Sequence, residues 1–238
     1  IGVRLVGSEM CIRDSHSKYH HGRADSFSAF SYTVCGDPVN LYRLNIDLSL
    51  SNAKEVVESA VEGLGLKPAS MVISFAPCTD LAVSGAAHFE KKRTIDPEFQ
   101  HKATKLAVLA STFGCAYAVE NPVSVLATLW RKPDMYWNPC DFAGYCPAGA
   151  HPEFPDILPE QDRYNKKTCL WTGNGFVHPR FKHIPSVQHM NPAHQKLGGK
   201  SARTKYIRSL TPRGFSQAVF EANTGAAVVP FQTELRLR

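Results

Sequence analysis

The chain has 238 residues, of which 43% are hydrophobic and 20% charged, and its formal net charge is +6 at pH 7. This mixture supports a packed core and excludes a disordered, collagen-like or coiled-coil protein. No stretch reaches the roughly 18 uninterrupted apolar residues of a membrane-spanning helix, so we expect no membrane partner.

The charge is distributed unevenly along the chain. Residues 1–160 carry 14 Lys and Arg against 18 Asp and Glu, a balance of −4, whereas residues 161–238 carry 13 against 3, a balance of +10. Such asymmetry favours a polyanionic partner for the last third of the chain. The alternative is a basic surface that only aids solubility.

The seven cysteines are odd in number and irregularly spaced, and no secretory signal is visible. We therefore expect a reducing, cytoplasmic compartment, in which these residues are thiols, metal ligands or a nucleophile.

The first 15 residues, IGVRLVGSEMCIRDS, resemble a translated sequencing adapter. We expect residues 1–15 to be a non-native segment, and the natural protein to be truncated upstream of about Ser15. The alternative interpretation is an ordinary β-strand, VRLV. We leave the segment out of the fold prediction.

Residues 16–130 are predicted to form a truncated Rossmann-like catalytic core, in which residues 16–33 form a loop. Residues 41–48 alternate as a strand does and end near Asp47. Residues 53–66 have the apolar spacing of an amphipathic helix, which Gly63 and Gly65 end.

The middle of this core alternates between strands and helices. Residues 71–76 and 115–120 are short apolar runs, typical of strands that are buried on both faces of a parallel sheet. A long helix is expected at about 97–114, after a polar loop, and a short one at 123–130. The pattern predicts an α/β fold with a mostly parallel sheet and crossover helices.

From Arg131 onward Pro, Gly and aromatic residues dominate. We predict that residues 131–205 form a loop-rich, DNA-contacting subregion, with a strand at 166–173 and a basic loop at 178–205. Residues 206–238 are expected to return to the core through a helix at 211–223.

Polar residues follow the predicted strands at the point where each strand ends. In an open parallel sheet the carboxyl ends of the strands meet at one edge, which is where ligands bind. Cys78, Glu120, Asn121 and Asp47 are therefore expected at a common edge. A cysteine there is a candidate nucleophile and a carboxylate a candidate acid or base, although both residue types also occur at strand ends for packing alone.

Two motifs at these positions add a resemblance. APCTDLAVSG (76–85) and VENPVS (119–124) resemble the Pro-Cys and Glu-Asn motifs of DNA cytosine-C5 methyltransferases, most closely compact phage- and prophage-type methylase-like proteins. Similar phrases, such as KKTCLWTGNGF and AVFEAN, follow in the same order, so the resemblance covers roughly residues 40–223. It implies a monomeric enzyme that transfers methyl from S-adenosylmethionine to cytosine in double-stranded DNA.

The resemblance also implies roles for single residues. The Cys78 thiolate would add to C6 of a flipped-out cytosine, and Glu120 would hold the N3 edge of the base. Asn121 would structure its loop. Pro77 would fix the turn beside the cofactor, and Asp47 would contact the cofactor adenine.

The DNA contacts are assigned to Thr79, which stands where many relatives have Gln, and to basic residues late in the chain. These basic residues are Lys166, Lys167, Lys200, Arg203, Lys205, Arg208 and Arg213. Trp171 and Tyr145 are candidates for stacking on bases, with core packing as the alternative.

Three alternatives stay open. No Gly-rich loop precedes Asp47, so the chain is alternatively an inactive nucleic-acid-binding module of the same fold. Cys140, Cys146, His151 and Cys169 could make it a zinc-stabilised DNA-binding protein, but their spacing does not match usual zinc motifs, and we expect no metal. A related enzyme that transfers another one-carbon unit would also use the cysteine.

Overall fold

The computed structural model describes residues 3–5, 27–34, 37–44, 46–198 and 201–224. The chain divides into two compact units, which are described separately. The first unit contains residues 1–34, 38–136 and 167–176, and the second contains residues 35–37, 137–166 and 177–238.

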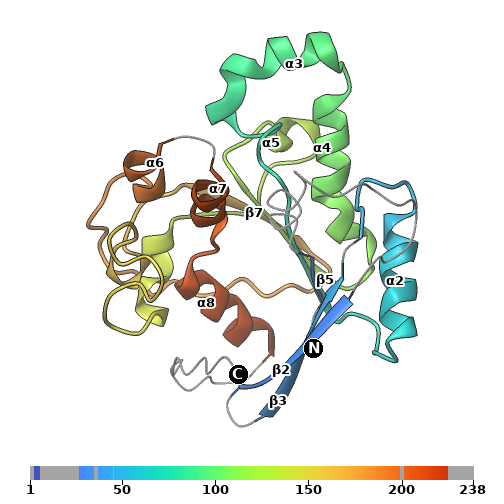
Figure 1. Ribbon diagram of the computed structural model, residues 1–238, viewed down its shortest axis with the longest axis horizontal. Helices are drawn as coiled ribbons and strands as arrows, with labels where there is room; N and C mark the ends of the chain where they lie inside the picture. Colours follow the sequence, from blue (N-terminus) through green and yellow to red (C-terminus); the bar gives the residue numbers. More distant parts are fainter. Residues whose placement is uncertain (1–2, 6–26, 35–36, 45, 199–200, 225–238) are drawn as a thin grey trace. The chain divides into compact units, whose positions relative to one another are not determined.

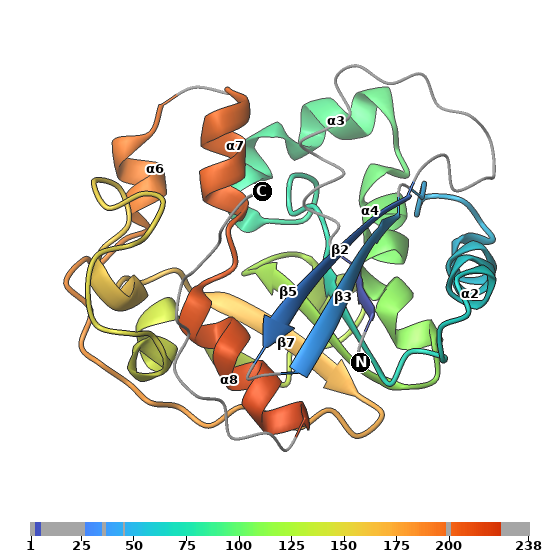
Figure 2. The same cartoon turned by 60° about the horizontal axis from the view of Figure 1, so that its bottom comes forward.

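A five-stranded sheet with the order β1-β4-β5-β7-β6 forms the centre of the first unit. Its strands β5 and β7 are labelled in Figure 1. Its strands are β1 (Val3–Leu5), β4 (Met71–Phe75), β5 (Ala116–Pro122), β6 (Met135–Trp137) and β7 (Thr168–Gly173). β4 pairs in parallel with β1 and with β5, but β5 pairs antiparallel with β7 (Figure 2). The chain therefore has a mixed α/β fold, and the Rossmann-like assignment stays a prediction.

Helices of the first unit pack through apolar faces that the sequence spacing defines. α2 (Ala53–Gly63) buries Ala53, Val57 and Val61, which are four residues apart and so lie on one face. α4 (Phe99–Val108) buries Ala107 in the same cluster as Val72 of β4 and Val119 of β5. This cluster is the core of the sheet.

Several predicted elements are confirmed in this unit. The strands expected at 71–76 and 115–120 are β4 and β5, and they are parallel. The short helix expected after residue 123 is α5 (Leu126–Leu129). The long helix expected at 97–114 is shorter, because α4 is followed by the 3₁₀ helix η2 (Leu109–Thr112).

Other predictions for this unit were wrong. The polar loop expected before residue 97 contains the 3₁₀ helix η1 (Val83–His88) and the helix α3 (Phe89–Ile95). β2 (Phe27–Val34) occupies part of the loop expected at 16–33. It pairs with β3 (Asp37–Leu44) in a separate two-stranded sheet, so the strand expected at 41–48 is outside the main sheet.

β1 comes from residues 1–15, the segment that resembles a translated sequencing adapter. Its backbone pairs with β4 in the register Val3–Val72, Arg4–Ile73 and Leu5–Ser74. The conformation is thus that of the alternative interpretation, an ordinary strand. The resemblance to an adapter concerns its origin and stays a prediction.

The second unit has short helices joined by long loops. These are the 3₁₀ helices η3 (Pro139–Tyr145) and η4 (Glu160–Asp162) and the α-helices α6 (Pro192–Lys196), α7 (Ala202–Ser209) and α8 (Arg213–Thr224). α8 confirms the helix expected at 211–223, whereas α6 and α7 show that residues 178–205 are not all loop. Trp137, Phe142 and Phe215 form its aromatic core, in which the Trp137 and Phe215 rings stack with centroids 4.0 Å apart.

A candidate active site at the edge of the sheet

The ends of β4 and β5 bring the two sequence motifs together. Phe75, the last residue of β4, is paired with Glu120 in the parallel register. Cys78 therefore follows β4 at the same edge of the sheet where Glu120 and Asn121 end β5. This is the juxtaposition that the strand pattern predicted.

Asn121 connects the two motifs directly. Its side chain is fully buried, and its Nδ2 donates a hydrogen bond of 3.2 Å to the carbonyl of Ala76, the residue before Pro77. A buried amide with this partner fixes the start of one loop relative to the end of the other strand. Asn121 Oδ1 and Ser124 Oγ are also buried at this edge, and neither has a hydrogen-bond partner among the described residues.

Backbone hydrogen bonds join the loops beyond the motifs. Val83 N donates to the carbonyl of Val123 (3.1 Å), and Val125 N donates to the carbonyl of Leu81 (2.9 Å). The carbonyl of Cys78 accepts from the N–H groups of Leu81 (3.1 Å) and Ala82 (2.8 Å), which closes a turn at the cysteine. The turn leaves Cys78 exposed, so its sulfur is accessible to a ligand.

Lys92, which the sequence analysis did not single out, supports the cysteine loop from α3. Its Nζ donates to the carbonyl of Thr79 (2.9 Å) and forms an ion pair with Asp80 Oδ1 (2.6 Å). Gln100 of α4 donates to the carbonyl of Asp80 (3.4 Å). In the sequence Lys92 belongs to a charged run that looks like any solvated helix face, so no local signal distinguished it.

β7 delivers a cation to the same edge because it runs antiparallel to β5. Thr168, its first residue, is paired with Pro122, so Lys167 lies near the end of β5. Burial, reinforced by the negative charge of Glu120, raises the pKa of the Cys169 thiol to about 11, and Lys167 opposes this rise. Cys169 is thus a neutral thiol near Glu120, which leaves Cys78 as the accessible sulfur.

The placement of Asp47 does not follow the prediction. β3 lies outside the main sheet, and Asp47 follows it in a loop. Asp47 Oδ1 accepts hydrogen bonds from Ser49 N (2.9 Å) and Ser49 Oγ (2.6 Å), which is a local turn. The reason for expecting Asp47 beside the other strand ends, a place at the end of a strand of the main sheet, was therefore wrong.

The predicted DNA-contacting residues are in different environments. Lys167 lies 5.0 Å from the centroid of the Tyr136 ring, whereas Arg203 and Lys205 are exposed on α7. Lys166 is half-buried in the second unit, and Lys200 lies outside the described residues.

Two of the predicted DNA-contacting arginines have structural partners instead. Arg208 Nη2 donates to the carbonyl of Leu197 (2.6 Å), and Arg213 donates through its guanidinium to both carboxylate oxygens of Asp162. We conclude that these two guanidinium groups stabilise the second unit.

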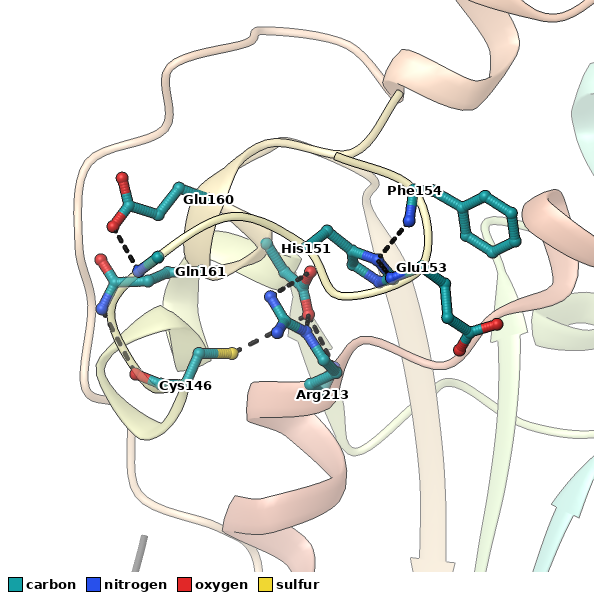
Figure 3. A network of polar contacts seen from close by, with 9 residues as sticks. Cys146, His151, Glu153, Phe154, Glu160, Gln161 and Arg213 are labelled. Atoms are coloured by element: carbon teal, nitrogen blue, oxygen red, sulfur yellow. Dashed lines mark hydrogen bonds and ion pairs between the residues drawn. The ribbon is translucent and has the colours of Figure 1, made fainter. Parts of the chain in front are cut away.

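Arg213 belongs to a buried polar network in the second unit (Figure 3). Asp162, only 2% exposed, accepts from Arg213 N (2.7 Å) and faces the Cys146 sulfur at 3.8 Å. His151 Nδ1 accepts from the N–H groups of Glu153 (3.3 Å) and Phe154 (3.1 Å). Burial and the nearby Arg213 charge lower the pKa of His151, although Asp162 and Glu153 oppose this shift.

Cys140, Cys146, His151 and Cys169, considered as zinc ligands from the sequence, are not found as one metal-binding group among the described residues. Cys146 and His151 have the partners just described, and Cys169 belongs to β7 of the first unit. Among the described residues, Cys140 is grouped instead with Asp141 and His183.

The aromatic residues considered for base stacking have other partners. Trp171 is fully buried and its Nε1 donates to the carbonyl of Arg131 (2.7 Å), so it is a core residue. Tyr145 donates to the carbonyl of Arg180 (2.9 Å), and its ring lies under Lys182 Nζ at 3.8 Å.

Comparisons with known proteins do not assign this chain to a family. No protein-family model matches the chain, and no curated protein matches it. Within the residues that the structure describes, no helix is both long enough and apolar enough to cross a membrane.

Proposed function

We propose that this chain is a DNA cytosine-C5 methyltransferase in which the Cys78 thiolate attacks a flipped-out cytosine. The observation that supports this most strongly is the buried hydrogen bond from Asn121 to Ala76, which joins the Pro-Cys and Glu-Asn motifs at one edge of the sheet. The exposed position of Cys78 agrees with a nucleophile that must reach a base.

The proposed chemistry uses one thiol and one carboxyl group. The Cys78 sulfur forms a bond to C6, and the electron pair of the C5–C6 double bond moves to C5, which becomes nucleophilic. Glu120, protonated at the N3 edge of the base, lowers the cost of this electron shift. Transfer of a methyl group to C5 would break its bond to the sulfonium sulfur of the donor and release the thioether; loss of the C5 proton to water and expulsion of the Cys78 thiolate would then restore the aromatic ring.

S-adenosylmethionine is the methyl donor that the resemblance implies. The described surroundings of Asp47 do not fit its adenine, because Asp47 lies outside the main sheet and its Oδ1 accepts two hydrogen bonds from Ser49. We therefore assign residues only to the steps that involve the base. This misfit favours one second candidate, a nucleic-acid-binding module of the same fold that does not transfer methyl groups.

Double-stranded DNA is the proposed partner. Lys167 is adjacent to the end of β5 through the pairing of Thr168 with Pro122, so its charge suits a phosphate near the flipped base. The exposed side chains of Arg203 and Lys205 supply further positive charge. Binding should weaken steeply with salt, because each neutralised phosphate releases counterions.

The nucleophile is tested with duplex DNA that contains 5-azacytosine. Attack at C6 followed by protonation at N5 gives a covalent adduct without any methyl donor, and this adduct reverts only when the N5 proton and the Cys78 thiolate leave together. We expect a denaturant-resistant complex with the unaltered chain and none with Cys78→Ser. Cys115→Ser is the matched control, because Cys115 precedes β5 and lies at the opposite edge of the sheet.

Methyl transfer is tested separately with 5-fluorocytosine DNA, which forms a stable adduct only after C5 has been methylated. An adduct that needs added S-adenosylmethionine supports the methyltransferase. An adduct with 5-azacytosine but not with 5-fluorocytosine overturns methyl transfer and keeps Cys78 as a nucleophile. If neither DNA is trapped while both are bound, the chain is the non-catalytic binding module.

The role of Glu120 is tested by kinetics on the same substrates. Glu120→Gln keeps the size of the side chain but removes the acid, and we expect trapping to slow by ~10²–10⁴. A change of less than a few-fold would remove Glu120 from the site.

A further inference from the structure

Three side chains from two distant segments of the second unit converge on one point. Cys140 and Asp141 belong to η3, and His183 belongs to the loop that precedes α6. The sulfur, one carboxylate oxygen and one ring nitrogen all lie within 4.8 Å of one another. The closest pair, His183 Nδ1 and Asp141 Oδ1, is separated by 3.1 Å.

Backbone hydrogen bonds fix this convergence. Lys182 N donates to the carbonyl of Asp141 (3.0 Å), and Ile184 N donates to the carbonyl of Cys140 (3.1 Å). His183 is therefore held between two residues that are both bonded to the Cys140–Asp141 segment. Gly144 permits the close approach, because a Cβ at this position would lie 2.8 Å from the carbonyl oxygen of Lys182.

The chemistry of the three groups selects a class of metal ion. Thiolate, imidazole and carboxylate are the ligands of Zn²⁺, whereas Mg²⁺ and Ca²⁺ prefer sites made of oxygen atoms. In a tetrahedral zinc site with ordinary bond lengths, ligand atoms are about 3.5 Å apart. The 3.1 Å between His183 Nδ1 and Asp141 Oδ1 is close to this value, and the Cys140 sulfur, which lies within 4.8 Å of both atoms, would move closer to them on metal binding.

The neighbours of the three groups suit a metal site. Asp141 Oδ2 accepts from Asn138 N (2.7 Å), which orients the carboxylate, and Oδ1 faces His183 Nδ1 at hydrogen-bond distance (3.1 Å), a contact that a bound metal would replace. Cys140 is only 3% exposed, whereas the His183 side chain is 54% exposed. The metal would thus enter from the histidine side, where water can supply a fourth ligand.

We propose that Cys140, Asp141 and His183 form a Zn²⁺ site that joins η3 to the 182–184 segment. This site differs from the set of Cys140, Cys146, His151 and Cys169 considered from spacing, and it is independent of the proposed activity at Cys78. Its role is structural. A bound ion would add a cross-link between two segments that are already joined by backbone hydrogen bonds, by the Tyr145–Arg180 hydrogen bond and by contact of the Phe142 and Phe181 rings.

The experiment measures metal binding by the full chain after treatment with a chelator. We expect one Zn²⁺ per chain on reloading, a rise in melting temperature on binding, and a thiolate-to-metal charge-transfer band when Co²⁺ replaces Zn²⁺. Cys140→Ser should abolish that band. His183→Gln should weaken Zn²⁺ binding by more than the roughly 10- to 100-fold that changes outside the ligand shell cause.

Matched controls separate ligand loss from general damage. His178→Gln alters an exposed histidine of the same segment, and Cys146→Ser alters a buried cysteine whose sulfur faces Asp162. Both should retain stoichiometric Zn²⁺. Because His183 is exposed, His183→Gln should fold normally by circular dichroism. Absence of Zn²⁺ binding in the unaltered chain, or unchanged binding in folded His183→Gln, would overturn the proposal.

Discussion

The two units of this chain are stabilised in different ways. In the first unit, strands supply regular backbone pairing, and the apolar cluster around Val72 and Val119 covers them. In the second unit, short helices and loops depend on single side chains, such as buried Asp162 and the stacked rings of Trp137 and Phe215. The candidate nucleophile is thus presented by the regular unit, whereas the second unit contains a polar network around the buried carboxylate of Asp162.

The largest expected effect is at the aspartate and arginine pair of the second unit. Asp162 in the second unit is buried and accepts from both the backbone and the guanidinium of Arg213, so Asp162→Ala leaves a part-buried charge without its partner. We expect the free energy of unfolding to fall by about 3–5 kcal/mol in urea titrations.

The control for this substitution is Asp134→Ala in the first unit. Asp134 accepts from Thr172 N (2.7 Å) and from Arg131 Nη1 (2.8 Å), but its side chain is 34% exposed. A loss of about 1 kcal/mol is expected there, because water replaces much of the interaction. Equal losses at both positions would contradict the proposed difference between the units.

Two glycines provide a second comparison. A Cβ on Gly214 would collide with the backbone carbonyl of Phe142, whereas a Cβ on Gly173 would meet the side chain of Tyr117. Because a side chain can move and a packed backbone cannot, Gly214→Ala should destabilise by about 1–3 kcal/mol, more than Gly173→Ala. Thermal unfolding of both variants measures the difference, and the reverse order would show that the second unit adapts more easily than its packing indicates.

Alkaline pH should weaken the second unit through Cys146. Burial, and then the charge of Asp162, raises the pKa of this thiol from 9.0 to about 12. The folded state keeps the proton above pH 9 while the unfolded chain loses it, so this contribution to stability is present below pH 9 and is lost as pH rises toward 12. We expect about 1.4 kcal/mol less stability at pH 10 than at pH 7, and Cys146→Ser should remove that part of the pH dependence.

Acidic pH should have a smaller effect through His151. Burial and Arg213 lower the pKa of this imidazole below 6.5. The stability that neutral His151 contributes is therefore present above pH 6.5. It is lost as the pH falls toward the pKa of His151 in the folded state, because the unfolded chain takes up a proton first. Urea titrations between pH 7 and pH 5 should show that the free energy of unfolding falls as the pH falls, and that it falls less steeply in His151→Gln. An identical slope in that variant would assign the acid sensitivity to other groups.

Sequence patterns predicted the individual strands and helices whose formation depends on neighbouring residues. The apolar runs at β4 and β5 and the spaced valines of α2 indicated their elements, and the pairing of β4 with β5 followed from the strand-helix-strand order. The same logic failed for Asp47, because alternation shows that a strand exists but not which strand it pairs with. β7 was expected as a strand, yet its antiparallel direction is decided by tertiary packing.

The candidate site could be predicted only where its residues follow strands. Cys78, Glu120 and Asn121 are ordered by the sheet, so topology was sufficient to bring them together. Cys140 and His183 are 43 positions apart and meet through loop backbone contacts, which leave no periodic pattern in the sequence.

The amide of Asn121 has a consequence for protein engineering. Because it spans from the second motif to the backbone before the first, the two loops form a single inherited module and not two exchangeable parts. A chimera that imports one loop without the other must therefore keep the backbone path that brings the carbonyl of residue 76 within reach of this amide, even if every imported side chain is the correct one.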